Sequence, residues 1–304
     1  MVNDADKSPT LIGVGSLFID DIVKPDGTSH MGVLGGAVIH ALMGAAIWEE
    51  RAGLCAVCGE GLPASARQFI REHLDLTGLT ILPIPQVRAW QIFEHDGRRR
   101  ELHRVDIVAP FVEGAQPNHL PDVYKNAKAY YLLQDFESIL RWRDHVSGLL
   151  LWEPNQLVMI PENRQKFRET LRTGAIDIVS PNLLEAQIIY GDLPPQQLIS
   201  AMLKDGATTV ALRMGSNGSI VANEQELHQI PAYTTNLVDP TGAGNTYCGA
   251  LLTGLMRGKS LMQAGIMGTV SASFCVETIG VVDPAKVDPQ ARDERVKHIQ
   301  SLIF

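Results

Sequence analysis

Val238-Asp239-Pro240-Thr241-Gly242-Ala243-Gly244-Asn245-Thr246 is the stretch around which the rest of this chain is organised. A mixed, strand-like segment leads up to it, from Leu227 to Tyr233 and then through Leu237-Val238. An apolar segment without proline, residues 247–256, comes after it. This order predicts a strand, a tight glycine turn and a buried helix that begins near Gly244.

A turn of this kind leaves several backbone N–H groups unpaired at the positive end of the helix dipole. It is therefore suited to bind an anion, above all a phosphate, and glycine lets the backbone approach the ligand closely. The stretch is not a Walker A loop, because no lysine follows Gly244, and it lacks the third glycine of a dinucleotide-binding fingerprint. An ordinary strand-to-helix turn is the alternative interpretation.

Residues 239–245, Asp-Pro-Thr-Gly-Ala-Gly-Asn, resemble the second signature of the ribokinase-like (PfkB) sugar and nucleoside kinases, D-T-x-G-A-G-D. Pro240 stands where the family usually has threonine, which is a mild departure. The departure at the last position is larger, because Asn245 occupies the place of the aspartate that serves the family as catalytic base.

Composition agrees with a soluble globular protein. The chain has 304 residues, 45% of them hydrophobic and 20% charged, with a net charge of −8 and a pI near 5.6. The acidic balance argues against nucleic acid or an anionic membrane as partner, and no apolar run has the length of a membrane span. The polar, acidic N-terminus, residues 1–6, is unlike a signal peptide, so we expect a cytoplasmic protein.

The cysteines, Cys55, Cys58, Cys248 and Cys275, lie in apolar surroundings, which is typical of buried thiols. The C-x-x-C pair at 55 and 58 falls on a predicted strand, and no second pair exists. We therefore expect buried structural cysteines rather than a redox or zinc site, and no structural transition metal.

The N-terminal segment carries the expected acceptor side. Residues 10–16 predict a central strand, and Asp20 matches the family aspartate that binds hydroxyls of the acceptor, with an N-cap or a solvated strand end as the alternative. Gly35 and Gly36 resemble the first family signature, G-G-x-x-x-N-x-A, and would let backbone approach the sugar. His40 replaces the asparagine of that signature, and it is either a substrate ligand or a buried core residue.

Residues 88–95 partly alternate, Asp96-Gly97 predicts a turn, and a second run returns through 98–105. Two-faced strands of this kind suit a small sheet with one wet face. The resemblance implies a β lid over the acceptor, built from about 16–35 and 86–106. We expect Arg98-Arg99-Arg100 to be a solvated strand end rather than a phosphate clamp.

The C-terminal part alternates strands with helices. That pattern predicts an α/β fold with a mostly parallel, doubly wound sheet between helical layers, in a single ribokinase-like domain over residues 1–304. The strands are expected at 129–133, 148–152 and 176–180, and the helices at 136–146, 164–171, 261–276 and 288–304.

Ligands of such a sheet gather beyond the carboxyl ends of its strands. Asn182 and Glu185 match the family's N-x-x-E motif, which implies a water-mediated Mg²⁺ site, although both residues also suit helix capping. Arg213, Gly215 and Gly218 resemble the nucleotide-side segment. Arg213 is expected either to reach a phosphate or to be a solvated strand end.

The resemblance further assigns Thr241 to nucleotide binding, and Asp239, with the segment 272–280, to a candidate K⁺ site. It implies ATP-dependent phosphoryl transfer to a hydroxyl of a sugar, nucleoside or related polyol, with Mg²⁺ as cofactor and a homodimer through the lid. The amides of Gly242, Ala243 and Gly244 would form the anion hole. Because an amide cannot accept the hydroxyl proton, Asn245 leaves three outcomes open: a slow kinase, a substitute base such as His40 or Asp20, or a pseudokinase that senses or scaffolds.

Overall fold

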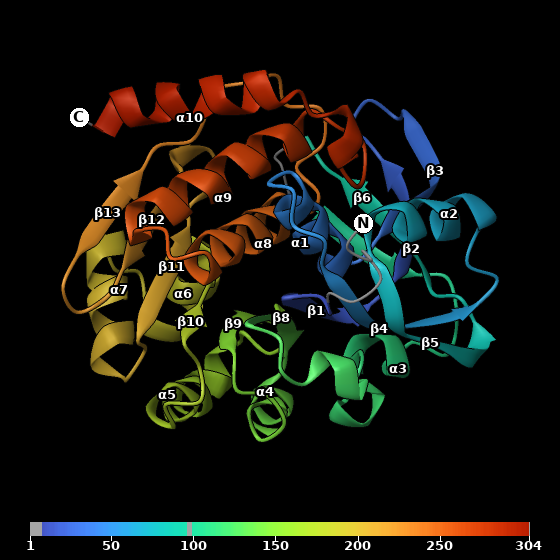
Figure 1. Ribbon diagram of the computed structural model, residues 1–304, viewed down its shortest axis with the longest axis horizontal. Helices are drawn as coiled ribbons and strands as arrows, with labels where there is room; N and C mark the ends of the chain where they lie inside the picture. The colour runs from blue at the N-terminus through green and yellow to red at the C-terminus, as the bar shows by residue number, and fades with distance from the viewer. Residues whose placement is uncertain (1–7, 96–98, 304) are drawn as a thin grey trace, which may run out of the picture.

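The computed structural model describes residues 8–95 and 99–303, and within them a nine-stranded sheet forms the centre of the molecule (Figure 1). Its strands lie in the order β13-β12-β11-β10-β9-β8-β1-β4-β5. Neighbours from β11 to β5 are parallel, whereas β12 and β13 run antiparallel at one edge. The strands are β1 (Leu11–Ser16), β4 (Gly53–Glu60), β5 (Asp75–Pro85), β8 (Ala129–Gln134), β9 (Leu149–Pro154), β10 (Ile178–Val179), β11 (Thr209–Arg213), β12 (Ser219–Ala222) and β13 (Leu227–Ile230).

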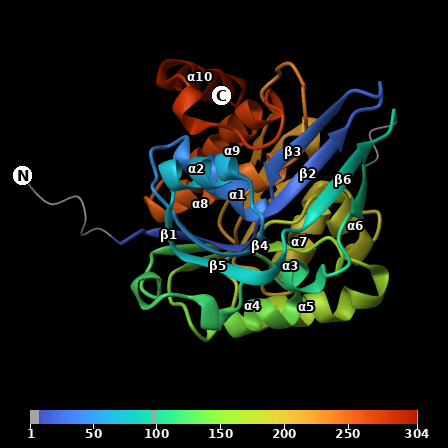
Figure 2. The same cartoon turned by 90° about the vertical axis from the view of Figure 1, so that its right-hand side faces the viewer.

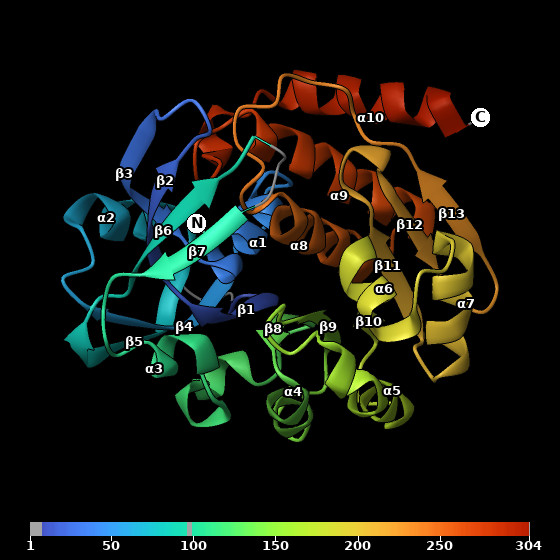
Figure 3. The same ribbon diagram turned by 180° about the vertical axis from the view of Figure 1, so that it is seen from behind.

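Helices cover both faces of this sheet and complete a three-layer sandwich (Figures 1 and 3). One layer contains α1 (Ala37–Ala46), α2 (Ala64–His73), α8 (Ala243–Met256), α9 (Leu261–Val276) and α10 (Pro289–Ile303). The other contains α3 (Ala109–Glu113), α4 (Phe136–Arg143), α5 (Arg164–Arg172), α6 (Leu183–Tyr190) and α7 (Pro195–Lys204). The predicted doubly wound α/β fold is confirmed.

The strands are apolar throughout because both of their faces are buried. Successive residues of β1 illustrate this: Leu11 joins the core under one helical layer, and Ile12 joins the core under the other. Cys55 and Cys58 likewise belong to opposite cores, so their side chains cannot form a shared metal or redox pair. All four cysteines are free and buried, as predicted.

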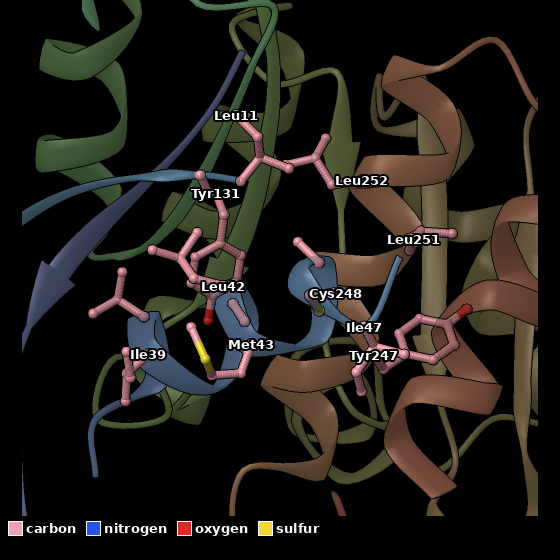
Figure 4. Packing of buried hydrophobic residues seen from close by; sticks show 14 of the residues in the cluster. Leu11, Ile39, Leu42, Met43, Ile47, Tyr131, Tyr247, Cys248, Leu251 and Leu252 are labelled. Carbon is pink, nitrogen blue, oxygen red and sulfur yellow. The ribbon is translucent and has the colours of Figure 1, made fainter. Parts of the chain in front are cut away.

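Small residues let α1 and α8 pack with their backbones close together. A Cβ atom at Gly44 would lie 2.1 Å from the Thr246 carbonyl oxygen, and one at Gly249 would lie 1.7 Å from the Ala41 carbonyl oxygen. Leu42, Cys248 and the residues around them fill the same interface (Figure 4). This contact holds the start of α8, and with it the glycine turn, against α1.

A second sheet of four strands, in the order β3-β2-β6-β7, lies beside the main one (Figure 2). It contains β2 (Phe18–Val23), β3 (Ser29–Gly35), β6 (Arg88–Phe93) and β7 (Arg99–His103), all within the two ranges from which the sequence predicts a lid. The strands β6 and β7 pair antiparallel, as the hairpin prediction requires, although the turn Asp96-Gly97 and Arg98 lie outside the described residues. Arg100 is exposed, with its Nε 3.6 Å from Glu94, in agreement with a solvated strand end.

The sequence prediction is wrong at two places. Leu237-Val238 is not a strand: residues 231–242 have no regular structure, and the N–H groups of Val238 and Asp239 donate to the carbonyl of Val276 at the end of α9. The edge strand β5, residues 75–85, was not predicted, and it forms by parallel pairing with β4. Over the described ranges no helix combines the length and apolarity that crossing a membrane requires.

Candidate active site

A cavity of about 380 Å³ lies where the carboxyl ends of the central strands meet the second sheet. Its wall joins residues that are far apart in the sequence, as expected for a doubly wound sheet. The predicted site residues that line it are Asp20, Gly36, His40, Asn182, Glu185, Arg213, Thr241, Gly242, Gly244 and Asn245. The structure therefore brings the expected acceptor side and the glycine turn into one cavity.

The glycine turn has the form that the sequence predicts. Gly242 is the N-cap of α8 in the left-handed conformation, with φ of 75°, where glycine is strongly favoured. Among the described residues, the N–H groups of Gly244 and Asn245 donate no hydrogen bond. Ala243 differs, because its N–H donates to the Pro240 carbonyl over 3.3 Å, so this amide is less available to a ligand than predicted.

The two glycines of the turn also make room for functional side chains. A Cβ atom at Gly242 would lie 2.1 Å from Nδ1 of His40, and one at Gly244 would lie 2.1 Å from Nη1 of Arg213. His40 is 2% exposed, yet it lines the cavity, so it is at once a core residue and a wall of the site.

The expected acceptor side lies on β2. Asp20 is buried, faces the cavity and accepts a hydrogen bond of 3.1 Å from Nε2 of Gln91 on β6. A Cβ atom at Gly35 would lie 1.9 Å from Oδ2 of Asp20, so Gly35 acts by leaving space for this carboxylate and does not itself line the cavity.

The neighbouring carboxylate, Asp21, has a structural role. It accepts hydrogen bonds from the Gly32 N–H and from the guanidinium groups of Arg88 and Arg104. Burial opposes its ionisation, but these three donors outweigh burial and hold the pKa of Asp21 below its usual value. Asp21 thus joins three strands of the second sheet.

Asn182 and Glu185 form a capping box at the start of α6. Oδ1 of Asn182 accepts from the Glu185 N–H over 2.9 Å, and Oε2 of Glu185 accepts from the Asn182 N–H over 2.8 Å. Burial raises the pKa of Glu185, and Arg213 opposes that shift. The hydrogen bonds thus show the capping role. Both residues also line the cavity, and their magnesium role stays a prediction.

Arg213 is not the solvated strand end that was one of its two expected roles. Its side chain is 12% exposed, and Nη1 lies 2.8 Å from Oε1 of Glu153, while Nη2 donates to the Ser180 carbonyl over 2.8 Å. Burial disfavours its charge, but Glu153 and then Glu185 outweigh burial and raise the pKa of Arg213. Arg213 thus places a fixed positive charge beside Gly244.

Asn245 is held by a buried group that was not predicted as a site. Its Nδ2 donates to Oε1 of Glu153 over 2.9 Å and to the hydroxyl of Tyr131 over 3.2 Å. The Tyr131 hydroxyl in turn donates to Oε2 of Glu153 over 2.7 Å. The signal in the sequence was Glu153-Pro154-Asn155 at a strand end, where the family often has D-x-N.

The remaining predicted residues lie outside the cavity wall. Gly215 and Gly218 form the turn between β11 and β12, with positive φ angles of 58° and 81°. Asp239 accepts hydrogen bonds from the N–H groups of Thr241 and Gly280, so it stiffens the approach to the glycine turn. No group of three or more His, Cys, Asp and Glu side chains in the described part of the chain is placed to hold a metal ion.

Comparison with known proteins finds a match to one family of kinases. Residues 153–288 match the pfkB family carbohydrate kinase model, a range that contains Glu153, Glu185, Arg213 and the glycine turn. Over this range the expected resemblance to the ribokinase-like PfkB kinases is confirmed.

The chain is similar along most of its length to named kinases. It is 26% identical to a cytidine kinase from Thermococcus kodakarensis, over 85% of this chain and 92% of the relative. An E. coli protein assigned as a ribokinase II, solved with ATP and Mg²⁺, superposes with a TM-score of 0.77 at 17% identity, over 95% of this chain and 99% of the other. Arabidopsis thaliana ribokinase, solved with ribose and ATP, gives 0.73 at 20%, over 96% and 99%. At these identities the structural likeness shows the shared fold.

Proposed function

We propose that this protein transfers a phosphoryl group from ATP to a hydroxyl of a small sugar, nucleoside or related polyol. The observation that carries the proposal is the meeting of Asp20, the Gly242–Gly244 turn and Glu185 on one cavity. A carboxylate that can accept hydrogen bonds from hydroxyls thus faces a phosphate-binding turn across a space of small-molecule size. The named relatives, a cytidine kinase and a ribokinase, act within the same broad substrate class.

The residues at the turn fit a nucleotide phosphate. Oγ1 of Thr241 is buried without a hydrogen-bond partner among the described residues, and it lies on the cavity wall. Together with the N–H groups of Gly244 and Asn245 it offers donors to phosphate oxygens, and Arg213 adds a positive charge. When bound, Mg²⁺ would offset charge on the triphosphate. Glu185 lines the cavity, and the family resemblance assigns to it the role of holding this ion through water.

The chain's own side chains would do the rest of the work by positioning. Asp20 would orient the acceptor through its hydroxyls, and Gln91 holds that carboxylate in place. The second sheet would act as a lid that excludes water and so limits wasteful hydrolysis. Preorganised donors at the turn would stabilise the charge that develops on the transferred group.

A coupled ATP assay with Mg²⁺ over a panel of sugars and nucleosides tests the proposal. We expect turnover with at least one acceptor, and loss of turnover in Asp20→Asn at comparable nucleotide affinity. The absence of transfer to every acceptor, together with the absence of ATP binding by calorimetry, would remove it.

A pseudokinase is the second candidate, and Asn245 is the observation that favours it. The resemblance places an aspartate at position 245, which would accept the proton of the acceptor hydroxyl. The amide of Asn245 instead donates a hydrogen bond to Glu153. Tight binding of ATP or of a panel member in calorimetry, without any transfer, would select the pseudokinase over the kinase.

Two finer features of the proposal follow from the resemblance. A monovalent cation near Asp239 would make turnover depend on K⁺. The carboxylate of Asp239 accepts hydrogen bonds from the N–H groups of Thr241 and Gly280, so Asp239 lies beside the turn. A homodimer through the second sheet would appear in sedimentation equilibrium. Replacing K⁺ by choline separates the first feature from the kinase activity itself.

A further inference from the structure

The orientation of the Asn245 amide is determined by its neighbours. Glu153 offers only acceptor oxygens when ionised, so the amide must turn its Nδ2 towards Oε1, 2.9 Å away. The Tyr131 hydroxyl donates its proton to Oε2 of Glu153, and it can therefore only accept from Nδ2 of Asn245. Asn245 is thus a hydrogen-bond donor to a carboxylate in the place where the family has the carboxylate itself.

Glu153 is a carboxylate that the fold keeps at the cavity. It is 4% exposed, it lines the cavity with Asn245 and Gly244, and Arg213 neutralises its charge at 2.8 Å. An ionised carboxylate has about four lone-pair positions. Arg213 and Asn245 both contact Oε1, whereas Oε2 accepts from the Tyr131 hydroxyl, and the Cys248 side chain also contacts the carboxylate.

The position of Glu153 in the sheet supports a role in the reaction. It lies near the carboxyl end of β9, a central strand flanked by β8 and β10, where ligands of doubly wound folds bind. A structural ion pair does not require a position at this edge of the sheet.

We propose that the proton-accepting carboxylate of this kinase has moved from position 245 to position 153, with Asn245 as the residue that positions it. The assignment rests on the proposed function. The hydroxyl of the acceptor loses its proton to Oε2 of Glu153 as its oxygen forms a bond to the γ-phosphorus of ATP. The bond from that phosphorus to the bridging oxygen breaks, and ADP leaves with the electron pair.

The assignment predicts a particular pH profile. The titratable groups that face Glu153 are Tyr131 on β8, Cys248 on α8, Arg213 on β11 and, beyond Arg213, Glu185 on α6. Burial raises the pKa of Tyr131 and of Cys248, so neither ionises near neutral pH. A carboxylate base at position 153 predicts an acid limb of kcat that is lost when Glu153 is replaced by glutamine.

The test compares Glu153→Gln, Glu153→Asp and the pair E153Q/N245D with the wild type. We expect E153Q to lower kcat by about 10²–10⁴-fold and to lose the acid limb, with little change in KM for ATP. E153Q/N245D, which returns one carboxylate to position 245, should recover at least about tenfold over E153Q. Glu50→Gln is the matched control, because Glu50 is also an Arg-paired, largely buried carboxylate but lies away from the cavity.

Each outcome decides the assignment. If the wild type is active and E153Q has an unchanged kcat or retains the acid limb, the assignment of Glu153 is overturned and the proposed function stands. A wild type that transfers to no acceptor overturns the proposed function and this assignment with it. Thermal melting and calorimetric ATP binding establish that each variant is folded. If E153Q does not fold, E153D replaces it as the test. A reduced kcat with a retained acid limb in E153D supports the assignment, and a wild-type kcat in E153D overturns it.

A second readout needs neither nucleotide nor turnover. Asn245→Asp sets a second carboxylate against Glu153, and the pair must then share a proton. We expect the melting temperature of N245D, relative to wild type, to fall as pH rises, and this dependence to vanish in E153Q/N245D. A pH-independent difference in N245D would mean that Glu153 carries no charge beside position 245, and would overturn the assignment.

Discussion

Replacing Asn245 by aspartate tests whether Glu153 is an ionised neighbour of position 245. The amide nitrogen now lies 2.9 Å from Oε1 of Glu153, so the substitution puts a carboxylate oxygen where a donor was. Two unit charges about 4 Å apart, at an effective dielectric constant of about 20, repel by about 4 kcal/mol. Arg213 offsets part of this repulsion because it lies 2.8 Å from the same carboxylate.

This repulsion converts into a pKa shift. It raises the pKa of the carboxyl introduced at position 245 above the value of about 3.9 in the unfolded chain, because the neighbouring carboxylate disfavours its ionised form. The folded variant then binds more protons than its unfolded chain above about pH 4, so its stability must fall as pH rises. The loss continues until the pH passes the raised pKa and is constant above it.

The assay is urea unfolding of wild type and N245D between about pH 4 and pH 8, with the difference in unfolding free energy plotted against pH. Asn245→Ala is the control, because it removes both donated hydrogen bonds without adding a charge, and its difference from wild type should not vary with pH. A flat N245D difference, parallel to that of N245A, would refute the reasoning.

Three further predictions follow from single contacts. Gly249→Ala should lower the unfolding free energy by about 1–3 kcal/mol, because its Cβ would lie 1.7 Å from the Ala41 carbonyl; an unchanged urea midpoint would contradict the packing described for α1 and α8. Asp21→Asn should destabilise the protein above about pH 4, because Asp21 has a lowered pKa and is ionised and paired there. The difference in unfolding free energy from wild type should vanish as the pH falls through the folded pKa. A difference that persists at low pH would show that the ion pairs are not its source. Thr241→Val should leave the ligand-free protein as stable or more stable, because Oγ1 is buried without a partner, and should weaken ATP binding in calorimetry by several-fold; unchanged affinity would separate this hydroxyl from the nucleotide site.

Local features of the sequence carried most of the fold. The glycine turn before an apolar helix, the apolar strands and the hairpin of β6 and β7 were recognisable, because each depends on turn chemistry or on residue periodicity within a short segment. The range 16–35 of the second sheet was expected only from the family resemblance. The residues of the cavity were recognisable for a different reason, since Asp20, His40, Asn182, Glu185, Arg213 and the glycine turn carry or replace positions of a known motif.

The sequence by itself therefore determined the turn, the doubly wound sheet and the set of residues at its carboxyl edge. Only the tertiary structure decided which of them touch. Glu153 reaches Asn245, 92 positions away, because parallel strands place their ends at one edge, and no pattern along the chain measures that distance. The roles of Gly35, Gly242 and Gly244 were settled in the same way, because the space that each leaves is filled by a side chain from a distant segment, Asp20, His40 or Arg213.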